Sequence, residues 1–250
     1  PIPAAPNEIS KVTSFQVINS VGFSSNRLSF LYYPQPMFVG VSPDHGPTCG
    51  GTRVTVSGLH FEDYGRIACL FGGVDVTGVW ISSTSVECTT PAAQNGVAME
   101  VSLYVSMNGL HFGSYTSTMT NSLMYRYVEP AIVSFLSPTS GLPLSSQREG
   151  DEGGKVTVYG ANFVEGISLV CRFGAILTAA TYISTSEVQC QIPPMSNGTG
   201  AKPRVSISTN GIDFSREGFS STIFTYYIAP EVLGLSPTLG PSTGGTVITI

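Results

Sequence analysis

The cysteines are the residues whose chemistry and spacing say most about this sequence. Cys69 and Cys88 lie 19 residues apart, and Cys171 and Cys190 have the same separation. Each of these cysteines shares its strand parity with apolar neighbours, so the alternation directs all four side chains toward a core. A core position suits a reduced thiol, which packs as a small hydrophobic group, as well as a disulfide. The same 19-residue spacing occurs in two stretches of the chain that repeat one another, as described below. This identical spacing favours one disulfide in each stretch, Cys69–Cys88 and Cys171–Cys190.

Zinc binding is a weaker interpretation of these cysteines, and the fifth cysteine stands apart from them. A structural zinc ion needs four ligands, and two cysteines per copy without a nearby histidine cannot supply them. Cys49 has no counterpart elsewhere in the chain. It directly precedes a Gly-Gly-Thr sequence, and Thr243 stands in the same place before the later Gly-Gly-Thr sequence. We interpret Cys49 as a free loop thiol or as a cysteine that pairs outside this sequence. Disulfides form in oxidising compartments, so the two pairs indicate a secreted or surface protein.

One asparagine lies in a glycosylation sequon. Asn197-Gly198-Thr199 is the only N-x-S/T sequence in the chain, and it falls in a predicted loop. Sugars are attached to such asparagines on exposed loops of secreted proteins. Because the cysteines already indicate an oxidising compartment, we predict a glycan on Asn197.

No set of residues predicts catalysis, a cofactor or a metal site. His45, His60 and His111 do not recur at the matching positions of the second copy, so we interpret each as a solvated loop or strand-end residue. The acidic segment 149–152 is interpreted as a solvated loop. The sequence contains no nucleophile elbow, phosphate-binding loop, zinc-protease helix or EF-hand pattern. We therefore predict that the protein is not an enzyme and uses no cofactor.

Composition limits the partners that the chain can have. Of its 250 residues 42% are apolar and 11% are charged, and the formal net charge is −5. An acidic chain with few cations does not follow nucleic-acid phosphates, so we expect no nucleic-acid partner. No apolar run approaches the roughly 18 residues that cross a bilayer. We interpret the sequence as a fragment, and expect membrane attachment only through regions outside it.

Repeats of a whole module supply the elements that must position the cysteines. The module boundary is marked by a tyrosine three residues before a proline: Tyr33 and Pro36, Tyr127 and Pro130, Tyr227 and Pro230. The intervals of 94 and 100 residues between these prolines match a β-sandwich domain and exceed a solenoid repeat. We therefore predict the C-terminal part of one module (1–33), two complete modules (34–127 and 128–227) and the start of a further one (228–250).

Alternation of apolar and polar residues predicts strands throughout each module. Val54 and Val56 alternate with polar residues, and Val156 and Val158 repeat the pattern in the second module. About seven such strands per module are separated by glycine, proline and Asn-Gly turns, and no stretch has a helical period. The fold class is therefore all-β, with tandem immunoglobulin-like antiparallel β-sandwiches.

The combined motifs resemble a known family. Ser-Pro and Gly-Gly-Thr open a module, and then come Cys-x-Phe-Gly at 69–72, Ser-x-Val-x-Cys-x-x-Pro at 85–91 and Val-Ser-x-Asn-Gly-x-x-Phe at 105–112. Together they resemble tandem IPT/TIG domains, the immunoglobulin-like (E-set type) modules of plexins, scatter-factor receptors and fibrocystin-like surface proteins. The resemblance covers essentially the whole chain, and the cysteine pair is typical of the extracellular members. It implies an extracellular or cell-surface location, and it transfers no ligand-binding residues.

The resemblance and the composition lead to one leading hypothesis for the function. The chain would be a non-catalytic spacer, adhesion or receptor-ectodomain segment whose partner is a protein ligand or another copy of itself. One alternative is an accessory, possibly glycan-binding, module of a secreted carbohydrate-active enzyme, since IPT/TIG-like domains also accompany such enzymes. Another is a transcription-factor dimerisation or DNA-binding module, which the acidic charge and the paired cysteines oppose.

Overall fold

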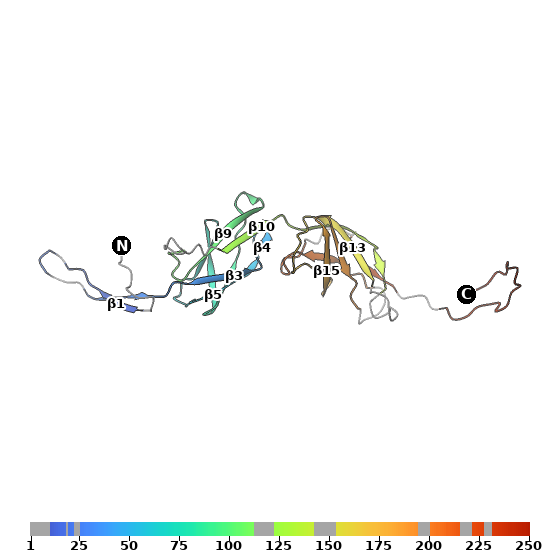
Figure 1. The fold of residues 1–250 in the computed structure, drawn as a ribbon, viewed down its shortest axis with the longest axis horizontal. Coiled ribbons are helices and arrows are strands. Elements are labelled where there is room, and N and C mark those ends of the chain that lie inside the picture. The colour runs from blue at the N-terminus through green and yellow to red at the C-terminus, as the bar shows by residue number, and fades with distance from the viewer. Residues whose placement is uncertain are drawn as a thin grey trace. The chain divides into compact units, whose positions relative to one another are not determined.

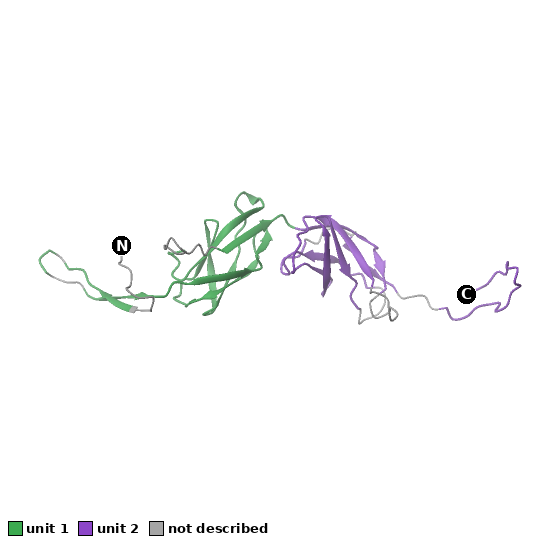
Figure 2. Ribbon diagram, in the orientation of Figure 1, with its two compact units in different colours: residues 1–130 green, residues 131–250 purple. Residues whose placement is uncertain are grey.

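The chain forms two compact units, residues 1–130 and residues 131–250 (Figure 1, Figure 2). The computed structural model describes residues 11–18, 20–22, 26–112, 123–142, 154–194, 201–215, 222–227 and 232–250. Within these ranges helical geometry is confined to the 3-10 turn η1 (Gln94–Gly96) and to Thr222, and the regular structure is otherwise β-strand. The all-β prediction is therefore confirmed.

The first unit holds a separate hairpin and a sandwich. Its strands are β1 (Lys11–Phe15), β2 (Leu28–Tyr32), β3 (Met37–Ser42), β4 (His45–Pro47), β5 (Arg53–Leu59), β6 (Ala68–Phe71), β7 (Val74–Ser82), β8 (Ser85–Thr89), β9 (Met99–Ser106) and β10 (Leu123–Val128). The sandwich strands hydrogen-bond in the order β3-β5-β8-β7-β6-β9-β10-β4. The first half of β7 pairs with β6 and the second half pairs with β8, so β7 links the two layers.

The second unit repeats this arrangement. Its strands are β11 (Ile132–Ser137), β12 (Ser140–Gly141), β13 (Lys155–Ala161), β14 (Val170–Phe173), β15 (Ile176–Ser184), β16 (Glu187–Gln191), β17 (Val205–Ser208) and β18 (Thr225–Tyr226). Six of them form a sheet in the order β11-β13-β16-β15-β14-β17, and β12 pairs with β18. Strand β15 pairs first with β14 and then with β16, and so it corresponds to β7.

Burial follows the alternation that the sequence predicts. Along β5 the side chains of Val54 and Val56 are buried, while the residues between them face solvent. Val156 and Val158 of β13 are buried in the same way. Complete burial of each valine contributes roughly 1.5–3 kcal/mol relative to an exposed position, so this pattern fixes the inner face of each strand.

Two short strands make the sandwiches less uniform than expected. Strand β4 pairs with β10 in parallel, with His45 opposite Arg126, and β12 pairs with β18 in parallel. They raise the number of sandwich strands per unit to eight within the described ranges, where the sequence predicts about seven. Strands of two or three residues are too short to show an alternation, so the sequence could not reveal them.

Candidate functional site: the disulfide-stapled sandwiches

Each disulfide joins two strands that are not hydrogen-bonded to each other. Cys69 of β6 is bonded to Cys88 of β8, with 6.5 Å between their Cα atoms. Cys171 of β14 is bonded to Cys190 of β16, with 5.9 Å between theirs. All four cysteines are buried, as their parity predicts. Since β7 separates β6 from β8 in the order of strands, and β15 separates β14 from β16, the bridges tie the two layers together across the core.

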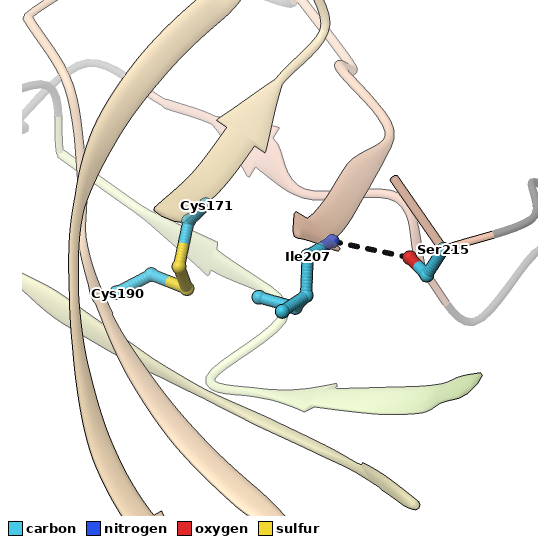
Figure 3. Close-up of a disulfide and its surroundings, with 4 residues drawn as sticks. All are labelled: Cys171, Cys190, Ile207 and Ser215. Carbon is cyan, nitrogen blue, oxygen red and sulfur yellow. Dashed lines mark hydrogen bonds between the residues drawn. A yellow bond between two sulfur atoms is a disulfide. The ribbon is translucent and has the colours of Figure 1, made fainter. Parts of the chain in front are cut away.

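The second bridge lies beside a strand that is itself firmly held (Figure 3). Ile207 of β17 is the register partner of Cys171, and its side chain is fully buried. The N–H of Ile207 donates to Ser215 Oγ at 3.1 Å, and the carbonyl of Ile207 accepts from the N–H of Ser215 at 2.7 Å. These two bonds hold the segment that follows β17 against the strand next to the disulfide.

Gly78 of β7 makes room for the first bridge. Its register partner is Cys88, and a Cβ at this position would lie 3.2 Å from Cys88 Sγ and 2.7 Å from a methyl group of Ile67. Ala180 is the corresponding partner of Cys190, so the second unit accommodates one methyl group there. The space beside the first bridge is therefore smaller than a branched side chain requires.

Gly78→Val is expected to lower the free energy of unfolding of the first unit by about 1–3 kcal/mol, because overpacking forces neighbouring side chains out of position. Urea unfolding followed by fluorescence reports on this unit alone, since Trp80 is the only tryptophan of the chain. Thr77→Val, at the exposed neighbouring position, is the control and should change the free energy by no more than about 0.5 kcal/mol. Equal stability of the two variants would contradict the placement of Gly78.

A buried tyrosine closes each sandwich. Tyr127 of β10 donates its hydroxyl to the carbonyl of Pro91 at 2.9 Å, and Tyr226 of β18 donates to the carbonyl of Pro193 at 3.4 Å. The sequence repeat instead aligns Tyr127 with Tyr227. The structure corrects this alignment by one residue, because Tyr226 is 3% exposed and Tyr227 is 47% exposed. Two adjacent tyrosines satisfy the same sequence pattern, and only burial distinguishes them.

Burial raises the pKa of both closing tyrosines. Desolvation raises the pKa of Tyr226 to about 12. The pKa of Tyr127 is also raised, first by desolvation and then by the nearby hydroxyl of Tyr125. The neutral phenol is therefore favoured in the folded state, whereas the unfolded chain ionises its tyrosines near pH 10.

The stability contributed by these tyrosines should be fully present below about pH 10 and should be lost as the pH rises through their folded-state pKa values. The sign follows from the unfolded chain, which releases the phenolic proton first. Tyr127→Phe keeps the buried ring but removes the titrating group, so the first unit of this variant should lose stability less steeply at alkaline pH. Urea midpoints read from Trp80 fluorescence measure both slopes, and identical slopes would contradict the raised pKa of Tyr127.

His45 is an exception to the expectation that every histidine is solvated. His60 and His111 are exposed as predicted, but His45 of β4 is only 5% exposed. Its Nδ1 atom donates to Asp44 Oδ1 at 2.7 Å, and this hydrogen bond lowers the pKa of the Asp44 carboxyl. The pairing of β4 with β10 buries this histidine, and so short a strand gave no alternation from which its burial could be predicted.

The remaining sites predicted from the sequence lie outside the sandwich cores. Asn197 and the acidic segment 149–152 fall outside the described residues, so glycosylation of Asn197 stays a prediction. Cys49 is a free, exposed cysteine between β4 and β5. Among the described residues, no three histidine, cysteine or acidic side chains converge as they would around a metal ion. The described segments also include no helix of the length and hydropathy that crosses a membrane.

Exposed apolar side chains occur in each unit on strands of the sheet that contains β5 or β13. In the first unit they come from β3, β5 and β7: Met37, Val39, Leu59, Val79 and Ile81. In the second unit Phe135 of β11 is 49% exposed and stacks on its register partner Tyr159, with ring centroids 4.6 Å apart. The exposure of Phe135 could not be predicted from the sequence, because the one-residue irregularity at Val133–Phe135 becomes visible only once the strands are paired.

The sequence of this chain is similar to fibrocystin-L and to plexins. Residues 36–121 and 136–226 match the family model of the IPT/TIG domain. Fibrocystin-L of Homo sapiens is 25% identical over 243 residues, which cover 93% of this chain and 5% of that protein. Plexin-A2 of Mus musculus is 31% identical over 223 residues, which cover 86% of this chain and 11% of that protein. The chain thus spans only a small part of the relatives it matches.

A solved structure supports the same fold. The full extracellular region of Plexin A4, domains 1 to 10, matches with a TM-score of 0.51 and 18% identity, over 95% of this chain and 20% of that one. The predicted immunoglobulin-like sandwich fold is therefore confirmed. The buried disulfides fit the predicted extracellular location, because such bonds persist in oxidising surroundings. With both sequence matches lying on the two sandwiches, the chain belongs to the IPT/TIG domain family.

Proposed function

We propose that this chain is a non-catalytic extracellular segment that spaces neighbouring modules and binds a protein partner. The partner is a protein ligand or a second copy of the chain. The observation that carries the proposal is the exposed apolar side chains of each unit taken by itself: Phe135, which stacks on Tyr159, in the second unit, and Val79 with Ile81 in the first. Exposed apolar groups on a rigid, disulfide-stapled sheet are suited to contact with another protein surface.

The module boundaries proposed from the sequence find support in a repeated pair of aromatic rings. Tyr125 and Tyr127 have ring centroids 5.1 Å apart in an edge-to-face arrangement, and Phe224 with Tyr226 has 5.2 Å. Phe30 and Tyr32 of the hairpin β1–β2 repeat this geometry at 5.1 Å. We propose that residues 1–33 and 228–250 belong to flanking modules and that 34–127 and 128–227 are complete ones.

Self-association of the chain and its binding to cells test the proposed function. Labelled, disulfide-intact chain should bind saturably to a second copy in sedimentation experiments or to proteins on intact cells. Phe135→Lys should weaken this binding about tenfold, because a buried apolar contact of this size is worth at least 1.4 kcal/mol. Ile167→Lys is the matched control, since Ile167 is fully exposed outside the strands and should not affect binding.

Enzyme treatment of the cells separates the alternatives. Loss of cell binding after protease treatment would support a protein ligand. Loss after glycosidase treatment alone would favour the glycan-binding accessory module, and salt-dependent retention on DNA would favour the transcription-factor module. Absence of both self-association and cell binding would contradict the proposal.

A further inference from the structure

We propose that Asn95-Gly96, in the loop between β8 and β9, is a site of spontaneous modification that converts Asn95 to isoaspartate or aspartate. The chain contains four Asn-Gly pairs: Asn95-Gly96, Asn108-Gly109, Asn197-Gly198 and Asn210-Gly211. Sequence alone gives them equal reactivity, because glycine has no Cβ to hinder attack by its backbone nitrogen. The folded structure separates the three described pairs by how firmly each side-chain amide is held.

The reaction needs only water as a second reactant. The backbone nitrogen of Gly96 loses its proton and attacks Cγ of Asn95; the new N–Cγ bond forms as the Cγ–Nδ2 bond breaks, and the amide nitrogen leaves as ammonia. One water molecule then opens the five-membered imide. Cleavage between the Gly96 nitrogen and Cγ gives aspartate. Cleavage between that nitrogen and the main-chain carbonyl carbon of Asn95 gives isoaspartate, whose backbone is one methylene longer.

The side chain of Asn95 lacks the hydrogen bonds that hold the other two asparagines, although one backbone hydrogen bond of Gly96 opposes the reaction. Asn95 and Gly96 are both exposed, and the side chain of Asn95 makes no hydrogen bond to the residues that the structure describes. A Cβ built on Gly96 would meet nothing within 4 Å. Asn95 has φ 60° and ψ 9°, so rotation about ψ must bring the Gly96 nitrogen toward Cγ. The hydrogen bond from the Gly96 N–H to the Ala93 carbonyl, at 3.0 Å, resists this rotation.

Asn108 is held by its own turn. Its Oδ1 atom accepts the N–H groups of Leu110 and His111, each at 3.0 Å. The same oxygen accepts the hydroxyl of Ser106 at 3.0 Å, and Nδ2 bonds to His111 Nδ1 at 3.0 Å. Several of these bonds must break before Cγ can turn toward the nitrogen of Gly109, so the fold protects this pair.

Asn210 is held in the same way and is also buried. It is 4% exposed, and its Oδ1 atom accepts the N–H groups of Ile212 and Asp213 at 3.1 and 2.8 Å. Ser208 Oγ donates to the same oxygen at 3.1 Å, and Nδ2 of Asn210 donates to Asp213 Oδ2 at 2.7 Å. Burial and four hydrogen bonds therefore protect the pair in the second unit.

Modification of Asn95 would alter a loop that is anchored on the preceding side. The N–H of Ala93 donates to the carbonyl of Thr48 at 2.8 Å, and Gln94 Nε2 donates to the carbonyl of Gly72 at 3.1 Å. Beyond these anchors the reaction adds a negative charge, and isoaspartate also lengthens the backbone.

Asn197 is the counterpart of Asn95 in the second module. Asn197 follows Cys190 by seven residues, as Asn95 follows Cys88. A glycan on Asn197 would substitute the nitrogen that must leave.

Peptide mapping in oxygen-18 water tests this proposal directly. The disulfide-intact chain is incubated in labelled water at mildly alkaline pH, digested at acidic pH, and analysed by fragmentation that distinguishes isoaspartate from aspartate. The native chain should incorporate label at Asn95 and at least about tenfold more slowly at Asn108 and Asn210, whose hydrogen bonds must break first. Asn95→Gln should remove labelling at this position and leave the other two unchanged.

The same incubation of the reduced, alkylated chain in urea is the control. There the three asparagines should react at similar rates, since each is followed by glycine and none keeps its native hydrogen bonds. The proposal is overturned if native Asn95 reacts no faster than Asn108 and Asn210. It is also overturned if the difference between them persists in the unfolded chain, because the fold would then not be its cause.

Discussion

Replacing Cys171 and Cys190 together by alanine is expected to lower the free energy of unfolding of residues 131–250 by about 3 kcal/mol. The bridge closes a loop of 19 residues, and removing it restores that much chain entropy to the unfolded state. Both cysteines are fully buried, so the lost sulfur packing adds to the effect. Calorimetry of the whole chain should show one transition lowered by roughly 10 °C or more.

Two controls identify the source of this change. The transition of the first unit, read from the fluorescence of Trp80, should stay at its original temperature, because the altered bridge lies in the second unit. Cys49→Ala removes an exposed, unbridged thiol and should leave both transitions unchanged. An unshifted second transition in the double variant would show that Cys171 and Cys190 do not stabilise this unit by a bridge.

Tyr226→Ala is expected to destabilise the second unit by about 3–5 kcal/mol, the usual cost of deleting a large buried aromatic ring. Tyr226 is 3% exposed and contacts the fully buried Phe224 edge to face, with ring centroids 5.2 Å apart. Its hydroxyl also donates to the carbonyl of Pro193. Calorimetry of the whole chain should show the second transition lowered or abolished.

Tyr227→Ala is the matched control for this prediction. Tyr227 is 47% exposed, so its removal should change the free energy of unfolding by no more than about 0.5 kcal/mol. The sequence repeat alone makes the opposite prediction, because it aligns Tyr227 with the closing tyrosine of the first module. A larger effect at Tyr227 than at Tyr226 would contradict the register of β18.

The inner faces of the strands could be predicted from the sequence because their period is two. Val54, Val56 and the four paired cysteines all lie in the core, as their alternation with polar residues predicts. The repeated motifs also predicted how many modules the chain contains and in which order the motifs follow one another within each module. The all-β fold class followed from the alternation and the repeat, whereas the paired cysteines and the resemblance to IPT/TIG domains indicated the extracellular type of domain.

Features that depend on pairing between distant segments could not be predicted. His45 is buried because β4 pairs with β10, some eighty residues further along the chain. Phe135 becomes exposed through an irregularity in the pairing of β11 with β13. The different protection of Asn95 and Asn210 likewise depends on hydrogen bonds and burial that identical Asn-Gly sequences do not reveal.

Peptide mapping of the natively secreted chain without reduction is the decisive experiment for an extracellular, disulfide-stapled module. We expect linked peptides for Cys69–Cys88 and Cys171–Cys190, a free Cys49, and a sugar on Asn197. These results would support an extracellular, disulfide-stapled interaction module. Four free thiols and an unmodified Asn197 would contradict that function, while the β-sandwich fold itself would stand.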